Sequence, residues 1–444
     1  MATIVNPSNL LGEEVKLWNE EGGKGVQDDF GRSWTSLGTI VVGQTNIQSL
    51  CYLGDGIVLA GTIPNGKIAR STDYGRTWTD LGTIVAGEVN IWSLCYLGDG
   101  IVLAGTRIHG KIARSTDYGL TWTDLGTIVA GEGHIWSLCY LGNGIVLAGT
   151  GNNGKIVRST DYGLTWTDFR TIVPGEDYVY AVCYSGNGIV LAGTGNNGHI
   201  ARSTDYGLTW TDLGAVVAGE IITDSLAYLG NGTVLAGTYP NCKIVRSTDN
   251  GLTWTNLGTI VAGWAGVVTI CYLGNGTVLA GTSASGKIAR STDYGLTWTD
   301  LGAVVAGETT FPCLCYLGNG IVLVGTGNNG KIGRSTGYTK SPFETGVKDR
   351  SAILCTAGAL TLDAGHSVLV ASVGASTNVT LPDALPCTGR KYIIKNTSLA
   401  ANVGIFTSGG QTIDGLLTVT LVAGVNYILE VISDGANWRT LRQI

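Results

Sequence analysis

The chain has 444 residues, of which 14% are charged and 69 are glycine, and its formal net charge at pH 7 is −6. This charge excludes the basic surface of a nucleic-acid-binding protein, and the many glycines predict many turns. No apolar run approaches the roughly 18 residues of a membrane span, and the acidic N-terminus lacks the basic start and apolar run of a signal peptide. We expect residues 1–23 to be a lead-in or an attachment segment.

A sequence close to RSTDYGLTWTDLG, found at 114–126, recurs along the chain. Its copies share one tryptophan at intervals of 44 residues, at Trp34, Trp78, Trp122, Trp166, Trp210, Trp254 and Trp298. Within 89–126, the runs VNIWSLCYL, IVLAGT, KIARST and LTWTDLG are separated by turn sequences and predict four strands. A repeat of about 40 to 45 residues with four short strands has the size of one propeller blade.

The two ends of the repeat array complement each other. After KIGRST at 331–336 the sequence breaks into GYTKSPF, so the last copy lacks a fourth strand. An unmatched fourth strand, RSWTSLG, stands at 32–38. The sequence therefore predicts an all-β, seven-bladed β-propeller over residues 24–344, in which this N-terminal strand completes the last sheet and removes its open edge.

The recurring motif has a structural explanation. A carboxylate such as Asp117 can accept backbone N–H bonds within its own turn, Gly119 supplies a positive φ, and the Trp122 indole fills a gap against the next layer. The pattern resembles the Asp-box, S-x-D-x-G-x-T-W, of sialidase or BNR-repeat propellers over residues 29–298. This resemblance implies a fold rather than an activity, with structural aspartates at Asp29, Asp73, Asp117, Asp161, Asp205, Asp249 and Asp293.

The catalytic groups that a sialidase resemblance would require are not recognisable. A sialidase needs an arginine triad, a tyrosine nucleophile with a glutamate, and an F-R-I-P-type segment, whereas FRTIVP at 169–174 occupies an ordinary fourth strand. The recurring arginines hold one equivalent position in every copy and cannot converge on one substrate. We place Arg70 opposite Asp80 as a cross-strand ion pair. Propeller glycosidases of the xyloglucanase type use two facing propellers, and this chain has one.

The cysteines do not suggest disulfides or a metal site. Cys51, Cys95, Cys139, Cys183, Cys271 and Cys315 occupy one equivalent strand position. Stacked sheets lie about 10 Å apart, whereas bridged Cα atoms lie within about 7 Å. We therefore expect unpaired core thiols in a chain that matures in a reducing cytosol. The remaining cysteines lack C-x-x-C spacing, so neither a metal nor another cofactor is indicated.

The copies differ from one another in two short segments. One segment precedes the first strand of each copy, and the other joins the second strand to the third. In an up-and-down blade these two connections emerge on the same face. We predict a ligand-binding surface there that consists of Glu88, Trp92, Arg107, His109, Glu132, His134, Trp136, Asn152, Asn153, Tyr178, Tyr180, Asn196, Asn197 and Tyr239.

Aromatic rings beside carboxylates and amides suit a carbohydrate ligand, because sugar C–H faces stack on rings and hydroxyls pair with polar groups. Further carboxylates at Glu176, Glu220 and Glu308 and the amide pair 328/329 share this face. Simpler explanations stay open. The rings can fill space near a central channel, the Asn-Asn-Gly loops are favoured turns, the single histidines lack metal-ligand companions, a carboxylate ring can be merely hydrated, and duplicated loops drift.

The C-terminal region, 345–444, has another composition and no Asp-box. It predicts short strands at HSVLVAS, NVTLP, KYIIKN, VGIFTS, LLTVTLV, NYILEVIS and WRTLRQ, and about 100 residues can form a separate β-domain. The segments VTLPDA, GRKYIIKNT, GGQTIDG and VISDGANWRTL resemble C-terminal domains of bacteriophage tail fibres and other virion appendages. That resemblance implies a trimer with a β-sandwich, jelly-roll or β-prism tip.

Together these features predict a viral, most simply bacteriophage, tail-fibre or receptor-binding protein. It would be a homotrimer in the virion, assembled in the host cytoplasm, that binds a host surface glycan and other virion proteins. Trimerisation would raise the apparent affinity of weak sites about 100- to 10,000-fold. Two alternatives remain. One is a glycosidase or depolymerase that uses Asp177 and Asp224, the non-repeating carboxylates of the variable face. The other is a structural decoration protein.

Overall fold

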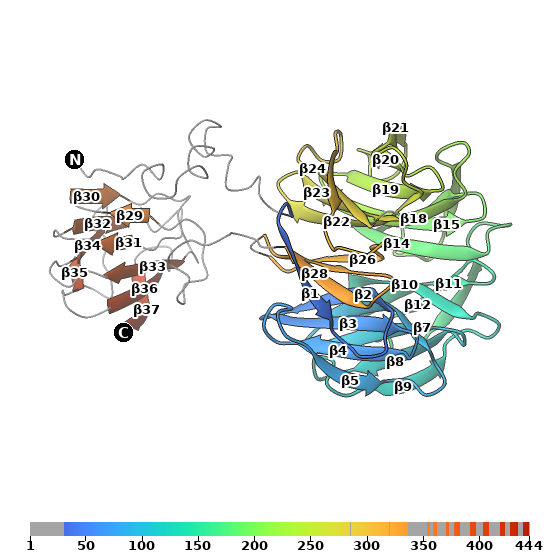
Figure 1. Ribbon diagram of the computed structural model, residues 1–444, viewed down its shortest axis with the longest axis horizontal. Helices are drawn as coiled ribbons and strands as arrows, with labels where there is room; N and C mark the ends of the chain where they lie inside the picture. Colours follow the sequence, from blue (N-terminus) through green and yellow to red (C-terminus); the bar gives the residue numbers. More distant parts are fainter. Residues whose placement is uncertain are drawn as a thin grey trace. The chain divides into compact units, whose positions relative to one another are not determined.

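The computed structural model describes residues 31–335 except 285 and 319, together with separate strands between 353 and 443; residues 169 and 170 are described by their backbone alone. The predicted segment 1–23, Asp29 and the predicted boundaries at 24 and 344 lie outside these residues. The chain divides into two compact units, 27–339 and the remainder. Every described element is a β-strand (Figure 1), and no described helix is long and apolar enough to cross a membrane.

The strands of 27–339 pair antiparallel in consecutive sets of four. The first strands of the sets are β2 (Asn46–Gly54), β6 (Asn90–Gly98), β10 (His134–Gly142), β14 (Tyr178–Gly186), β18 (Ile222–Gly230), β22 (Gly266–Gly274) and β26 (Cys313–Tyr316). The second strands are β3 (Ile57–Ile63), β7 (Ile101–Arg107), β11 (Ile145–Gly151), β15 (Ile189–Gly195), β19 (Thr233–Tyr239), β23 (Thr277–Ser283) and β27 (Val322–Gly325).

The outer two positions of each set are equally regular. The third strands are β4 (Lys67–Ser71), β8 (Lys111–Ser115), β12 (Lys155–Ser159), β16 (His199–Ser203), β20 (Lys243–Ser247), β24 (Lys287–Ser291) and β28 (Lys331–Ser335). The fourth strands are β5 (Thr79–Thr83), β9 (Thr123–Thr127), β13 (Thr167–Thr171), β17 (Thr211–Ala215), β21 (Thr255–Thr259) and β25 (Thr299–Ala303). The string FRTIVP thus begins in an ordinary fourth strand, β13.

The fourth strand of the last set comes from the other end of the repeat array. Strand β1 (Trp34–Thr39) pairs antiparallel with β28, with Trp34 opposite Ser335, and the two run side by side in Figure 1. The first and last sets also touch directly, because the Ile47 N–H donates to the Thr326 carbonyl at 2.9 Å. The predicted pairing of the N-terminal strand with the last sheet is therefore present.

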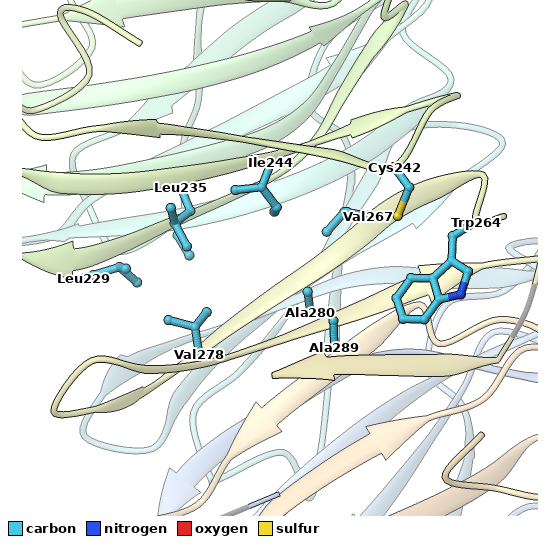
Figure 2. Packing of buried hydrophobic residues seen from close by; sticks show 10 residues of the cluster. Leu229, Leu235, Cys242, Ile244, Trp264, Val267, Val278, Ala280 and Ala289 are labelled. Atoms are coloured by element: carbon cyan, nitrogen blue, oxygen red, sulfur yellow. The ribbon is translucent and has the colours of Figure 1, made fainter. Parts of the chain in front are cut away.

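The hydrophobic core lies between neighbouring sets. Figure 2 shows one of these layers, in which Leu235 and Ile244 of one set pack against Val278 of the next, all 0% exposed. The second strands are buried along nearly their whole length because a sheet covers each face. A single set could not bury its own apolar residues, so the sets stabilise one another.

The turns between third and fourth strands have the predicted hydrogen bonds. The Asp117 carboxylate accepts the N–H groups of Leu120 at 3.0 Å and Thr121 at 2.9 Å, and Gly119 has a φ of 79°. A Cβ at Gly119 would meet a methyl group of Leu59 in the preceding set at 2.5 Å. The same i to i+4 backbone bond recurs at Asp73, Asp161, Asp205, Asp249 and Asp293.

The predicted Arg70–Asp80 ion pair is wrong. Asp80 lies opposite Ala69, its carboxylate pairs with Lys67 Nζ at 2.8 Å, and Arg70 Nε instead donates to the Tyr118 carbonyl of the next set at 3.0 Å. Arg70 lies opposite Thr79, so the count from the hairpin is off by one residue; the register shift between Lys67 and Ala69 lies farther from the turn and does not cause this difference. A shift of one residue moves a side chain to the other face of a strand. The recurring arginine therefore joins neighbouring sets.

The eight cysteines whose side chains the structure describes are all free thiols, as predicted. Burial raises the pKa of Cys51 to about 12, and its thiol hydrogen-bonds to the backbone of Tyr96 in the next set. These thiols are therefore protonated packing groups at neutral pH. Cys387 lies outside the described residues.

The other unit contains strands close to those predicted. They are β29 (Ile353–Cys355), β30 (Gly358–Thr361), β31 (Val370–Ser372), β32 (Thr377–Leu381), β33 (Lys391–Asn396), β34 (Val403–Thr407), β35 (Thr418–Leu421), β36 (Tyr427–Ser433) and β37 (Trp438–Gln443). Strands β30, β32 and β34 pair in parallel. A jelly roll is an antiparallel architecture, and these parallel pairs do not follow it, whereas β34–β35 and β33–β36–β37 pair antiparallel. The type of C-terminal domain stays a prediction.

Candidate functional site

The candidate site is built on a β-bulge that recurs in the first strands. In β6, Ile91 lies opposite Thr106 and Ser93 opposite Gly105, so Trp92 is an extra residue without a partner on β7. The same register shift occurs at Trp136, Tyr180 and Asp224 in the next three sets. A bulge releases its extra residue from the ladder and redirects its side chain. The fold thus presents one unlike residue per set from a common place.

Side chains from three consecutive sets meet at these bulges. The Trp136 ring contacts Trp92 edge-on, with centroids 4.5 Å apart, and lies 4.8 Å from the Tyr180 ring. A backbone bridge between His134 and Arg107 joins two of the sets at this point. We call this group the aromatic cluster; its members are Trp92, Arg107, His134, Trp136, Tyr178 and Tyr180, all partly exposed.

Glycines make room for the two central rings. A Cβ at Gly151 would clash with Trp136 Nε1, and a Cβ at Gly195 would clash with the Tyr180 ring. The rings therefore lie flat over the ends of β11 and β15. Trp136 Nε1 is buried without a hydrogen-bond partner among the described residues. The polar edge of this indole therefore faces the end of β11 and is not open to solvent.

Arg107 supplies the charge of the aromatic cluster. Its guanidinium carbon lies 4.9 Å from the Trp92 ring centroid and 5.6 Å from that of Trp136, which is cation–π geometry. Burial lowers the pKa of His134, and the charge on Arg107 lowers it further. His134 is therefore largely neutral at pH 7 while Arg107 stays charged. No described carboxylate forms an ion pair with Arg107.

Asp224 occupies the next bulge beyond Tyr180. Burial raises the pKa of Asp224 to about 7, and no described residue donates a hydrogen bond to its carboxylate. Burial, followed by the negative charge on Asp224, raises the pKa of Tyr180 to about 12. The row of bulge residues thus has a cation near one end, aromatic rings in the middle, and a carboxyl that is about half ionised at neutral pH near the other end.

The predicted surface carboxylates are instead buried, which corrects the predicted ligand-contacting role of Glu88 and Glu132. Glu132 is 3% exposed and accepts hydrogen bonds from Thr150 Oγ1 at 2.9 Å and Asn153 Nδ2 at 2.7 Å. Each such glutamate holds the loop between second and third strands of its own set, so no open carboxylate ring forms. The pairs are Glu88–His109, Glu132–Asn153, Glu176–Asn197, Glu220–Asn241 and Glu308–Asn329.

The remaining predicted residues fall into two groups. His109, Asn153 and Asn197 are exposed but bound to these buried glutamates, whereas Asn152 donates to the Gly131 carbonyl and Asn196 donates to Asp177 Oδ2 at 2.8 Å. Tyr239 packs near Gly266, and no ring contact joins it to the aromatic cluster among the described residues. The structure therefore brings together six of the predicted residues and separates Tyr239 from them.

Sequence reasoning missed the bulge and grouped Asp224 only with a catalytic alternative. A signal was present, because the third residue of each first strand changes while its neighbours stay similar. The residues at this position are Gln48, Trp92, Trp136, Tyr180, Asp224 and Val268. Among the described residues, no group of three or more histidine, cysteine, aspartate or glutamate side chains is placed to hold a metal ion.

The sequence matches no protein-family model, and a search of curated proteins returns no match. Solved structures show the fold. The structure of YCF48 bound to D1 peptide matches with a TM-score of 0.56 and 18% identity over 68% of this chain and 96% of that one. The WD40 β-propeller domain of Doa1 matches with a TM-score of 0.56 and 14% identity over 70% of this chain and 100% of that one.

A glycosidase is also similar. The GH74 xyloglucanase from Xanthomonas campestris matches with a TM-score of 0.51 and 15% identity, over 67% of this chain and 52% of that one. At these identities the likeness concerns the fold alone. The compact unit 27–339, which contains all the repeats, is therefore a β-propeller. Both binding proteins and glycosidases use this fold.

Proposed function

We propose that this protein is a binding protein and that its ligand, a carbohydrate, lies against the aromatic cluster. The observation that carries the proposal is the convergence of unlike residues. Most of each copy repeats closely, yet at one bulge position three consecutive sets place both Trp92 and Tyr180 in contact with the central Trp136 ring. These rings remain partly exposed, although a purely structural position could be filled by Val268, as in another set.

A closed ring of seven blades is part of the proposal. The 44-residue repeat, the pairing of β1 with β28 and the direct contact of the first and last sets support it. The hydrogen-bonded aspartate turns support the resemblance to Asp-box propellers. In such a ring the bulge residues gather where the first strands meet, so one ligand can touch several blades.

The chemistry of the cluster suits a sugar. Aromatic rings offer apolar faces to sugar C–H groups, while the Arg107 guanidinium offers donors to hydroxyls. The proposed context is a virion appendage, in which the C-terminal unit forms a trimer and multiplies a weak affinity about 100- to 10,000-fold. The short C-terminal sequence resemblance to tail-fibre domains supports this context.

The test is binding of the full chain to a glycan array and to host cells. Trp92→Gln is the main variant, because Gln48 occupies the same bulge in the first set and the backbone there accepts it. We expect loss of glycan binding with an unchanged melting transition. Tyr118→Ala is the matched control, since Tyr118 is an aromatic residue, 40% exposed, in an aspartate turn. Absence of binding to every glycan, or equal loss in both variants, would refute the proposal.

A glycosidase is the second candidate. Asp224 has the raised pKa of a general acid and follows Tyr180 in the row of bulge residues, and a xyloglucanase is among the similar structures. Asp177 is exposed and bound to Asn196. Release of reducing ends from a polysaccharide panel, abolished in Asp224→Asn, would establish this activity. Binding without any release would exclude it for that panel.

A further inference from the structure

We propose that the ligand of the aromatic cluster is an acidic sugar, whose carboxylate binds the Arg107 guanidinium. This inference rests on the proposed carbohydrate-binding function and adds the chemical class of the ligand. The geometry behind it is the position of the Arg107 guanidinium, which lies over the Trp92 and Trp136 rings at the bulges of two neighbouring sets.

The side chain of Arg107 differs from those of the recurring third-strand arginines in how it is bonded. The recurring arginines such as Arg114 donate Nε to a backbone carbonyl of the next set, here that of Tyr162 at 3.0 Å. The Arg107 guanidinium has no hydrogen bond or ion pair with a described residue, and it lies over the Trp92 and Trp136 rings. A guanidinium on a ring face has its N–H groups in its own plane, pointing outward from its central carbon. Two of these N–H groups can then bind the two oxygens of one carboxylate.

The position of Arg107 is not required by the fold. It ends the second strand β7, and the corresponding residues of the other sets are Ile63, Gly151, Gly195, Tyr239, Ser283 and Gly327. None of these carries a charge. Arg107 is thus the one cation among these corresponding residues. It stands in the same set as Trp92, the first tryptophan of the aromatic cluster.

The charges nearby leave Arg107 without a counter-ion. The Glu88 side chain is 0% exposed, its Oε1 pairs with His109 Nδ1 at 2.8 Å, and it forms no ion pair with Arg107. His134 is largely neutral at pH 7, as derived above. Asp224 lies at the bulge beyond Tyr180 and forms no ion pair with Arg107 among the described residues. A chain with net charge −6 therefore has a localised positive site among aromatic rings.

The experiment compares ligands that differ only in the carboxylate. The full chain is titrated calorimetrically with hexagalacturonate and with its methyl ester, and separately with 3′-sialyllactose and with its methyl ester. We expect at least one acid to bind about 10- to 100-fold more tightly than its neutral partner, as for loss of a charge-assisted bidentate contact. Arg107→Gln should remove this preference, and Arg107→Lys should restore part of it.

The control is Arg76→Gln, which removes the same charge from an exposed arginine in an aspartate turn. Arg76→Gln should leave the acid preference intact. Equal affinities for acid and neutral partners, or equal effects of Arg76→Gln and Arg107→Gln, would overturn the inference while glycan binding itself still stands. Absence of binding by acids and by every neutral glycan of the array would overturn the proposed function and this inference with it.

Discussion

Replacing Glu220 by glutamine tests the buried glutamates that hold the loops of the variable face. Glu220 accepts hydrogen bonds from Thr238 Oγ1 at 2.8 Å, from the Asn241 N–H at 3.1 Å and from Asn241 Nδ2 at 2.7 Å, and it pairs with Lys243 Nζ at 3.0 Å. Burial raises the pKa of Glu220, but these hydrogen bonds outweigh burial and the pKa lies below its usual value.

The expected change in the free energy of unfolding follows from the donors that lose their acceptor in Glu220→Gln. In Glu220→Gln, one carboxylate oxygen becomes an NH₂ group that faces Asn241 Nδ2 and Lys243 Nζ. Two charge-assisted bonds are lost, and Lys243 recovers part of its hydration, so we expect a loss of about 2–3 kcal/mol in the free energy of unfolding. The first set shows this arrangement naturally, because Gln44 accepts from Thr62 and Asn65 while its Nε2 is buried without a described partner.

The reciprocal substitution Gln44→Glu should therefore stabilise the protein by about 1 kcal/mol. Both variants are measured by urea unfolding at pH 7 and at pH 3. The stabilisation by ionised Glu220 is fully present above the pKa of a glutamate in the unfolded chain, about 4.3. It is lost as pH falls through the lower pKa of Glu220 in the folded protein, so the destabilisation by Glu220→Gln should shrink at pH 3. An effect below about 0.5 kcal/mol at pH 7, or destabilisation by Gln44→Glu, would refute the reasoning.

Three further predictions concern single groups. Burial raises the pKa of Asp161, but hydrogen bonds from Thr165 and Ser159 lower it to about 2, so Asp161→Ala should cost about 1–2 kcal/mol at pH 7 and much less at pH 2 in urea unfolding. Burial raises the pKa of Asp224 to about 7, so ionisation of this carboxyl destabilises the folded state as pH rises from about 4 through 7. Asp224→Asn should therefore stabilise the protein by about 1–3 kcal/mol at pH 8 but not at pH 4. An equal effect at both pH values would contradict this. A double-mutant cycle should give about 0.2–1 kcal/mol of coupling between Lys67 and Asp80 and none between Arg70 and Asp80.

The repeated parts of the fold were predictable because the period itself carries the information. A constant interval of 44 residues located the strands, the aspartate turns and the missing fourth strand of the last copy. The turn chemistry around Asp117 and Gly119 was predictable for the same reason, since local hydrogen bonds and a positive φ depend on neighbouring residues alone.

Register and burial were harder to predict. Arg70 lies opposite Thr79, one residue away from the predicted Asp80, and the bulge at Trp92 releases the side chain that contacts Trp136. No local signal in a strand sequence fixes a bulge. Glu132 is buried although glutamate is usually exposed, because its partners Thr150 and Asn153 come from a distant part of the repeat.

The most direct test of the central claim is a hydrogen-exchange footprint of the full chain with and without saturating hexagalacturonate. The account predicts slower exchange in segments 88–93, 104–110, 132–137 and 176–181, which carry the aromatic cluster and its supporting strand ends, and no change in the aspartate turns such as 117–121. Protection confined to the aspartate turns, or no protection in any of the four segments, would contradict it.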